Sequence, residues 1–282
     1  MSAPNARARE RKPLPLDADR LPALGPAFDR ALDDGLAALG ISLGPGARAA
    51  IDAQARLLMA WNAAINLTAL RTPEAIARLH VVDSLSALPL LRETANERDE
   101  SGGTLLDLGS GGGYPGLPLA VALPSGYAGL LDSIGKKARF LQAAADTAVA
   151  AMSRAGETSP RLGAIAGRAE ELARDSTHRE AWDVVTARAV GSLAEVVELA
   201  LPLLRLGGQL VCWKRDDGRG TLQAELDAAQ LVTGALGGGR PRVTRVAAPD
   251  PATHRLVQVI KEHRTPPRFP RGPAERRRAL LG

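Results

Sequence analysis

Residues 104–118 read TLLDLGSGGGYPGLP, a short apolar run that ends in a glycine-rich loop. Such a loop at the carboxyl end of a strand is typical of α/β folds, because glycines allow a sharp turn and a close approach of the backbone to a ligand. The spacing of Gly111, Gly113 and Gly116 fits the G-x-G-x-x-G pattern of dinucleotide-binding loops, which is weak evidence alone. A P-loop is excluded, because no Lys-Ser/Thr pair follows the glycines.

Further strand-like runs follow this loop, and helical segments separate most of them. This alternation predicts a mainly parallel sheet with helices on both faces. The last two runs are joined by a proline-rich loop without a helix, so we expect them to pair antiparallel at one edge. The seven expected strands cover residues 104–110, 127–133, 161–167, 182–189, 207–214, 242–248 and 255–261.

The region before the glycine loop has a helical period. Ile51, Ala55 and Leu58 recur on one face, and Thr72-Pro73-Glu74 is a helix start signal that combines a hydroxyl N-cap, a proline and an acid. A polar break at residues 93–103 ends this region. We therefore predict a flexible leader, an N-terminal helical domain, a sheet domain and a basic tail, at residues 1–25, 26–100, 101–263 and 264–282.

Composition excludes several classes of protein. The chain has 282 residues, 45% of them hydrophobic, and can bury a substantial core. Its one cysteine, Cys212, excludes a disulfide framework and an all-cysteine zinc site, and the four histidines show no metal-ligand spacing. No apolar run approaches a membrane span and no apolar run follows the basic N-terminus as in a secretory signal. We expect a cytoplasmic protein with no membrane and no metal partner.

Positive charge is concentrated at the two ends of the chain. Residues 264–282 contain six arginines and one acid, and residues 1–12 carry a net charge of +3. Because the whole chain has a net charge of +5, the remaining body is slightly acidic, at −3. Clustered arginines favour a polyanionic partner such as RNA, through counterion release, although basic ends can equally be disordered solubilising segments.

Two acids sharpen the interpretation of the glycine loop. Asp107 lies two residues before Gly109, where a carboxylate opposes a pyrophosphate but suits a ligand with a cationic amino acid end. Asp132, at the end of the second strand, is placed to accept both ribose hydroxyls. These features favour S-adenosylmethionine; a chance glycine-rich turn is the alternative. A short-chain dehydrogenase is excluded, because neither Tyr114 nor Tyr127 begins a Tyr-x-x-x-Lys motif.

Later strands supply three more candidate residues. Ala169 and Glu170 follow the third strand, where a loop normally reaches the adenine, although Glu170 also suits a solvated helix start. Arg188 ends the fourth strand, beside the expected meeting point of methyl donor and acceptor. It suits either an ion pair with a carboxylate or a contact with the acceptor.

The acceptor class is constrained by motifs that are missing. The Asn/Asp-Pro-Pro-aromatic motif of amino-methylating enzymes is replaced by Thr186-Ala187-Arg188-Ala189-Val190. Cytosine C5 methylation needs a thiolate, and Cys212 lies in an apolar strand as a small core residue. A ring nitrogen such as guanine N7 needs neither, because its lone pair attacks the methyl directly and catalysis reduces to alignment.

The chain resembles the bacterial ribosomal small-subunit methyltransferase G family, also called glucose-inhibited division protein B, over about residues 40–262. The matching pieces are Trp61-Asn62-x-x-Ile65-Asn66-Leu67-Thr68, His80-Val81-Val82-Asp83-Ser84-Leu85, residues 107–118, Leu131-Asp132-Ser133 with Lys136-Lys137, Gly167-Arg168-Ala169-Glu170 and Thr186-Ala187-Arg188-Ala189. Tyr114 stands where the family usually has Phe or Leu. The arginine-rich end looks like a tail that many members carry.

The resemblance implies methyl transfer from S-adenosylmethionine to N7 of one guanine in 16S rRNA, on free RNA or in the small ribosomal subunit, by a seven-stranded Rossmann-like fold. We expect Asn66 and Thr68 to line the acceptor pocket or to make capping bonds. Two rival functions stay open: a methyltransferase for a protein or small molecule, and a non-catalytic RNA-binding module. The expected cofactor-binding residues are Gly109, Gly111, Tyr114, Asp132, Ala169, Glu170 and Arg188, of which the resemblance implies all but Gly111 and Asp132.

Overall fold

The computed structural model describes residues 13–97, 103–123, 126–250 and 252–279. Within these ranges the strands form one seven-stranded sheet in the order β3-β2-β1-β4-β5-β7-β6. Each strand overlaps an expected run, so the prediction of seven strands is confirmed. The strands are β1 (Thr104–Leu108), β2 (Tyr127–Asp132), β3 (Arg161–Ala166), β4 (Trp182–Arg188), β5 (Leu204–Arg215), β6 (Arg242–Arg245) and β7 (His254–Ile260).

The first five strands are parallel, and β7 runs antiparallel to both β5 and β6. The expected antiparallel pairing of the last two strands is therefore confirmed, with β6 at the edge and β7 inserted beside β5. The strand order reverses between β1 and β4. In open α/β sheets, ligands bind outside the carboxyl ends of the strands at such a reversal.

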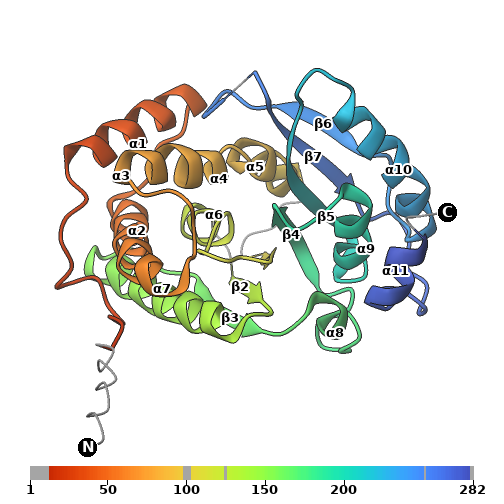
Figure 1. The fold of residues 1–282 in the computed structure, drawn as a ribbon, viewed down its shortest axis with the longest axis horizontal. Coiled ribbons are helices and arrows are strands. Elements are labelled where there is room, and N and C mark those ends of the chain that lie inside the picture. The colour runs from red at the N-terminus through yellow and green to blue at the C-terminus, as the bar shows by residue number, and fades with distance from the viewer. Residues whose placement is uncertain (1–12, 98–102, 124–125, 251, 280–282) are drawn as a thin grey trace, which may run out of the picture.

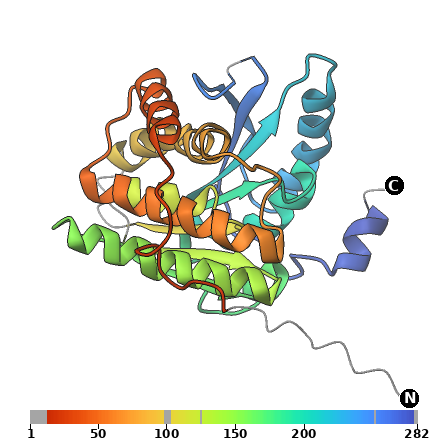
Figure 2. The same cartoon turned by 60° about the vertical axis from the view of Figure 1, so that its left-hand side comes forward.

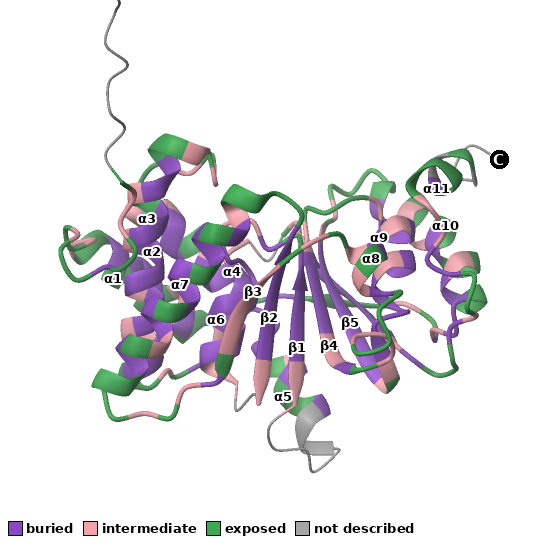
Figure 3. Ribbon diagram, turned by 90° about the horizontal axis from the view of Figure 1, so that it is seen from below, coloured by how far each residue is buried: buried purple, intermediate pink, exposed green. Residues whose placement is uncertain are grey.

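Helices cover both faces of the sheet (Figures 1 and 3). Alternate strand residues explain this arrangement: Leu105 and Val211 belong to one buried cluster, and Leu106 and Cys212 to the other. The α/β fold expected from the alternation of strands and helices is thus confirmed. The helices are α1 (Pro26–Leu39), α2 (Pro45–Ile65), α3 (Pro73–Ile76), the π-helix η1 (Ala77–Val82), α4 (Asp83–Leu85), α5 (Leu88–Glu97), α6 (Gly116–Ala122), α7 (Gly135–Arg154), α8 (Ala169–Leu172), α9 (Leu193–Ala200), α10 (Thr221–Ala235) and α11 (Pro273–Ala279).

The N-terminal helices pack directly against the helices of the sheet. Helix α2 lies along α7, where Trp61 meets Phe140 edge-on at 5.5 Å between ring centroids (Figure 2). Both belong to one buried cluster that also includes strand residues. The expected start at Thr72 is confirmed, because its side chain accepts a hydrogen bond from the Ala75 amide at 3.2 Å. No helix in the described ranges has the length and apolar character needed to cross a bilayer.

The predicted leader divides into two parts. Residues 1–12 lie outside the described ranges, whereas residues 13–25 run along α2 and α7. The indole nitrogen of Trp61 donates to the Pro15 carbonyl at 2.7 Å, Thr147 donates to the Leu16 carbonyl at 3.1 Å, and Ala18 is buried. These contacts hold this part of the predicted leader against α2 and α7.

The C-terminal segment is tied to the body of the protein. We call residues 264–272 the strap. The guanidinium of Arg179 donates to the carbonyls of Thr265, Pro266 and Phe269, and Arg271 forms an ion pair with the buried Glu198 at 2.6 Å. Arg271 therefore neutralises a carboxylate of this chain, and Arg179 holds the backbone of the strap. The strap leads to α11 at the outer side of the molecule (Figures 1 and 2).

Candidate functional site

A cavity of about 650 Å³ opens at the carboxyl ends of β1, β4 and β5. Its position at the reversal of strand order and its volume are those of a small-molecule site. One wall is the glycine loop, a second is the turn after β4, and a third comes from the N-terminal helices. The lining residues are 67–70, Leu79, His80, Asp83, 109–112, Tyr114, 187–191, Val196, 212–215 and His254.

The glycine loop requires left-handed backbone at three positions. Gly109, Gly111 and Gly113 have φ angles of +67°, +57° and +85°, which residues with a Cβ rarely adopt. A side chain at Gly109 would also come within 3.0 Å of Val190 across the cavity. The first two of these glycines line the cavity and keep it open.

Asp107 lies beneath the loop rather than in the cavity. Its carboxylate is fully buried and accepts hydrogen bonds from the Ser110 hydroxyl, the Gly116 amide and the Thr186 hydroxyl. Burial raises the pKa of Asp107 to about 6, although these three donors and Arg188 favour the charged form. The expected contact between Asp107 and a cationic ligand is therefore not what the structure shows: this side chain organises the loop.

Gln54 stabilises the glycine loop by hydrogen bonds, a role not expected from the sequence. It lies on the buried face of α2, and its side-chain amide donates to the carbonyls of Gly112 and Gly113 at 3.0 and 3.2 Å. A fully buried glutamine on an apolar helix face must find polar partners. The only signal in the sequence was the polar residue between Ile51 and Ala55 on that face.

The predicted Asp132 is attached to the glycine loop. Its carboxylate accepts hydrogen bonds from the amides of Gly111 at 3.1 Å and Ile134 at 2.9 Å. The side chain is 6% exposed and lies beside the cavity without lining it. Each carboxylate oxygen keeps a second lone pair, so the group retains the capacity to accept further hydrogen bonds.

The predicted Ala169 and Glu170 begin α8 and do not line the cavity. The Glu170 carboxylate is buried in an ion pair with Arg276 of α11. Burial alone would raise the pKa of Glu170, but the hydrogen bond and charge of Arg276 hold it below its usual value.

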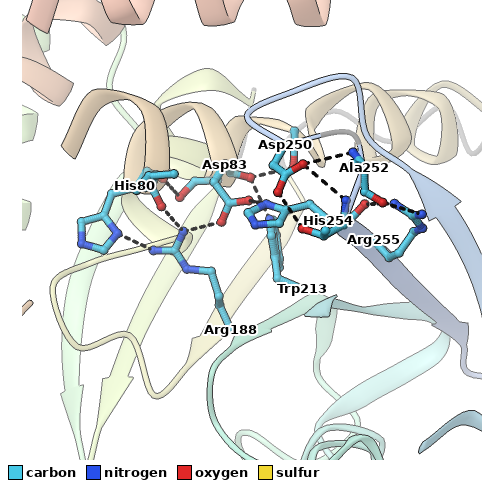
Figure 4. Close-up of polar contacts among 12 residues, drawn as sticks. His80, Asp83, Arg188, Trp213, Asp250, Ala252, His254 and Arg255 are labelled. Atoms are coloured by element: carbon cyan, nitrogen blue, oxygen red, sulfur yellow. Dashed lines mark hydrogen bonds and ion pairs between the residues drawn. The ribbon is translucent and has the colours of Figure 1, made fainter. Parts of the chain in front are cut away.

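Arg188 belongs to a polar network that joins β4, β7 and the N-terminal helices (Figure 4). Its guanidinium donates to Asp83 at 2.7 Å and to Nδ1 of His80 at 3.1 Å. The other oxygen of Asp83 lies 2.8 Å from Nδ1 of His254, and the indole of Trp213 donates to the Asp83 carbonyl at 2.7 Å. Of the two roles expected for Arg188, the ion pair with a carboxylate is present.

His80 is neutral, and its tautomer is determined by its neighbours. Burial, followed by the charge of Arg188, lowers the pKa of His80 to about 4. Because an arginine can only donate, Nδ1 of His80 accepts and Nε2 carries the proton. That proton points to the Thr68 hydroxyl, 2.8 Å from Nε2. The ring also stacks on Tyr114, with 4.7 Å between centroids.

The structure therefore brings together only part of the expected set. Gly109, Gly111, Tyr114 and Arg188 line the cavity, whereas Asp132 borders it and Ala169 and Glu170 lie outside its lining. The cavity is also lined by four residues for which no site role was expected: His80, Asp83, Trp213 and His254. The sequence held a signal for the first two, because His80 and Asp83 lie three residues apart in a helical segment that matches the family. In the structure His80 lies in η1, and π-helical turns are frequent at functional sites.

Cys212 does not have the ionisation state of a catalytic nucleophile. Burial raises the pKa of the Cys212 thiol to about 12, so no thiolate nucleophile is present at neutral pH. In the parts of the chain that the structure describes, no three His, Cys, Asp or Glu side chains gather as a metal site would require. The cavity consequently offers orientation and hydrogen bonding rather than a nucleophile.

Comparison with known proteins identifies relatives over most of the chain. The family model described as "rRNA small subunit methyltransferase G" matches residues 48–233. A protein named ribosomal RNA small subunit methyltransferase G from Symbiobacterium thermophilum is 33% identical over 87% of this chain and 94% of its own length. The protein of that name from Deinococcus radiodurans is 38% identical over 88% and 91%, and the one from Roseiflexus castenholzii is 37% identical over 78% and 86%.

Proposed function

Because the chain belongs to the rRNA small subunit methyltransferase G family, we propose that it transfers a methyl group from S-adenosylmethionine to N7 of one guanine in 16S rRNA. The observation that carries the proposal is the family match over residues 48–233, which includes every wall of the 650 Å³ cavity except His254. The cofactor supplies a methyl group already activated by a positive sulfur.

The cavity has the features that S-adenosylmethionine requires. Gly109 and Gly111 leave room for the ligand, since a Cβ at Gly111 would meet only one backbone oxygen, at 3.8 Å. Asp132 lies beside them with unused lone pairs for ribose hydroxyls. The Tyr114 hydroxyl is buried without a hydrogen-bond partner in the described structure, and a buried hydroxyl in that state favours a polar ligand nearby.

The protein's own residues bind and align the reactants. N7 of guanine has a free lone pair, so no side chain needs to remove a proton before attack. The acceptor side of the cavity has apolar walls, including Leu67, Leu79 and Val190, around the polar Thr68. Holding two reactants in line within such walls supplies several kcal/mol of rate acceleration, about 7–11 in the best cases.

In this proposal Arg188 lines the cavity as a side chain of fixed position. Two of its nitrogens are committed to Asp83 and His80, and its guanidinium carbon lies 5.9 Å from the centre of the Tyr114 ring. The pairing with Asp83 holds the cation beside the ring, and Tyr114 packs against the hydrogen-bonded pair of Arg188 and His80.

The RNA partner and the site of action are part of the proposal. We infer that 16S rRNA, free or in the small ribosomal subunit, reaches the cavity in the cytoplasm. Arg215 is exposed at the rim and ends β5, and it forms no ion pair within the described ranges, so it suits a phosphate contact. The proposed boundaries of the helical domain and sheet domain remain predictions.

Labelled methyl transfer tests the proposal directly. The protein and methyl-labelled S-adenosylmethionine are incubated in separate reactions with naked 16S rRNA, with small subunits and with ribosomal protein. We expect label in 16S rRNA at one guanine whose strand breaks after borohydride reduction and aniline treatment, as 7-methylguanosine does. Label confined to protein would establish the first rival function. Calorimetry that detects no binding of S-adenosylmethionine would exclude both methyltransferase functions and leave the non-catalytic RNA-binding module.

A further inference from the structure

Thr68 is held rigidly at the acceptor side of the cavity. Asn62, in the last turn of α2, bonds both backbone groups of Thr68: its amide donates to the Thr68 carbonyl at 3.0 Å and its oxygen accepts from the Thr68 amide at 2.9 Å. This double contact fixes the segment that enters the cavity wall. The position of the Thr68 side chain is therefore set before any ligand binds.

The hydroxyl of Thr68 has one direction left in which to bond. Its oxygen accepts from the Leu70 amide at 3.1 Å and from Nε2 of His80 at 2.8 Å. His80 is the donor in its bond to Thr68, because Arg188 donates to Nδ1 of the His80 ring and Nε2 therefore carries the proton. A hydroxyl has two acceptor lone pairs and one proton. Both lone pairs are used, and no residue in the described ranges accepts the proton.

The chain thus presents a hydroxyl to the cavity that can only donate. The ion pair between Arg188 and Asp83 maintains this state, since it keeps the guanidinium against Nδ1 of His80. The low pKa of His80 keeps its ring neutral across the physiological range. A bound group opposite Thr68 must consequently be an acceptor.

Guanine and adenine both carry N7, but they differ at the neighbouring position. Guanine has the acceptor O6 beside N7, whereas adenine has the N6 amino donor there. Taking guanine N7 as the methylated atom, as in the proposed function, we propose that the Thr68 hydroxyl donates a hydrogen bond to O6 of the target guanine. This contact leaves the N7 lone pair free and selects guanine over adenine, because a donor opposite N6 would leave two protons facing each other.

A substrate base that lacks O6 tests the proposal. The base used, 2-aminopurine, also lacks the N1 proton of guanine, and any effect of that lost proton should be the same in Thr68→Val as in wild type. Once the methylated nucleotide has been mapped, it is replaced in 16S rRNA by 2-aminopurine, which keeps N7 and the 2-amino group. Methylation rates at saturating S-adenosylmethionine are compared on both RNAs for wild type, Thr68→Val and Thr68→Ser. One lost hydrogen bond predicts that wild type is about tenfold slower on 2-aminopurine. Thr68→Ser, which keeps the hydroxyl, should preserve that ratio.

Thr68→Val should be about tenfold slower than wild type on guanine and should methylate both RNAs at equal rates. If Thr68→Val were also about tenfold slower on 2-aminopurine RNA than on guanine RNA, as wild type is, Thr68 would have a structural role only. General damage to the protein slows methylation of both RNAs by the same factor and leaves their ratio unchanged. Equal methylation of both RNAs by wild type would also overturn the proposal. This comparison uses the wild-type protein only, so it does not depend on whether a variant folds. Wild type inactive on guanine RNA would instead refute the proposed function.

Discussion

Replacing the buried Asp107 with asparagine should make the protein more stable at neutral pH. The carboxylate has no cation in direct contact and accepts its three hydrogen bonds from Ser110, Gly116 and Thr186. In Asp107→Asn the amide oxygen can accept from Ser110 and Gly116, and the amide nitrogen can donate to the Thr186 hydroxyl, which can rotate to accept. The variant thus keeps the three contacts without a buried charge.

The magnitude follows from the pKa of Asp107, which burial raises from 3.8 to about 6. One pKa unit corresponds to about 1.4 kcal/mol, so ionising the folded state costs about 3 kcal/mol more than ionising the unfolded chain. Below pH 3.8 both states are protonated and the cost is absent. The cost of ionisation grows as the pH rises from 3.8 to about 6 and is complete above about pH 6.

His80 imposes the opposite trend on the wild-type protein. Its pKa is lowered from 6.5 to about 4, so the folded state binds fewer protons than the unfolded chain and stability rises with pH across that window, by about 3 kcal/mol. The two effects nearly cancel in the wild type. The informative quantity is therefore the difference in unfolding free energy between Asp107→Asn and wild type at each pH.

Urea unfolding followed by circular dichroism between pH 4.5 and 7.5 measures this difference. We expect it to grow from about 1 kcal/mol at pH 4.5 to about 3 kcal/mol at pH 7.5. The control is Asp146→Asn, which changes an exposed carboxylate on α7 and should give a small difference at every pH. A constant difference, or an Asp107→Asn protein less stable than wild type at pH 7.5, would refute the reasoning.

Three further changes test other parts of the site. Asp132→Ala should weaken binding of S-adenosylmethionine by about 1–3 kcal/mol for each lost ribose hydrogen bond, and unchanged affinity in calorimetry would remove Asp132 from the site. Arg276→Met should lower the unfolding free energy by about 3 kcal/mol because it leaves the buried Glu170 carboxylate unpaired; Glu170→Gln in the same chain should recover part of this loss in urea unfolding. Arg215→Gln should reduce the slope of log affinity for 16S rRNA against log salt by about 0.7–0.9, whereas Arg161→Gln, at the start of the edge strand β3 and away from the cavity, should leave the slope unchanged.

Local patterns in the chain were sufficient to predict the sheet. Strands and the glycine loop depend on apolar periods and turn residues only a few positions apart, and the start signal at Thr72 depends on its own first turn. The antiparallel pairing of β6 and β7 also follows from the absence of a helix in their connection, whereas the order of the strands came only from the tertiary structure. For the same reason the position of Gly109 and Gly111 at the carboxyl end of the first strand could be predicted, and both line the cavity.

Partners far apart in the chain were decided only by the tertiary structure. Asp83 meets Arg188 across 105 positions and Glu170 meets Arg276 across 106, and no local pattern specifies which of several carboxylates an arginine will find. Burial likewise turned Asp107 toward its own loop and oriented the Thr68 hydroxyl through His80. The sequence alone determined which strand ends and glycine loop border the cavity, because backbone geometry is local. Which side chains line the cavity, and in which protonation state, depended on long-range packing and the exclusion of water.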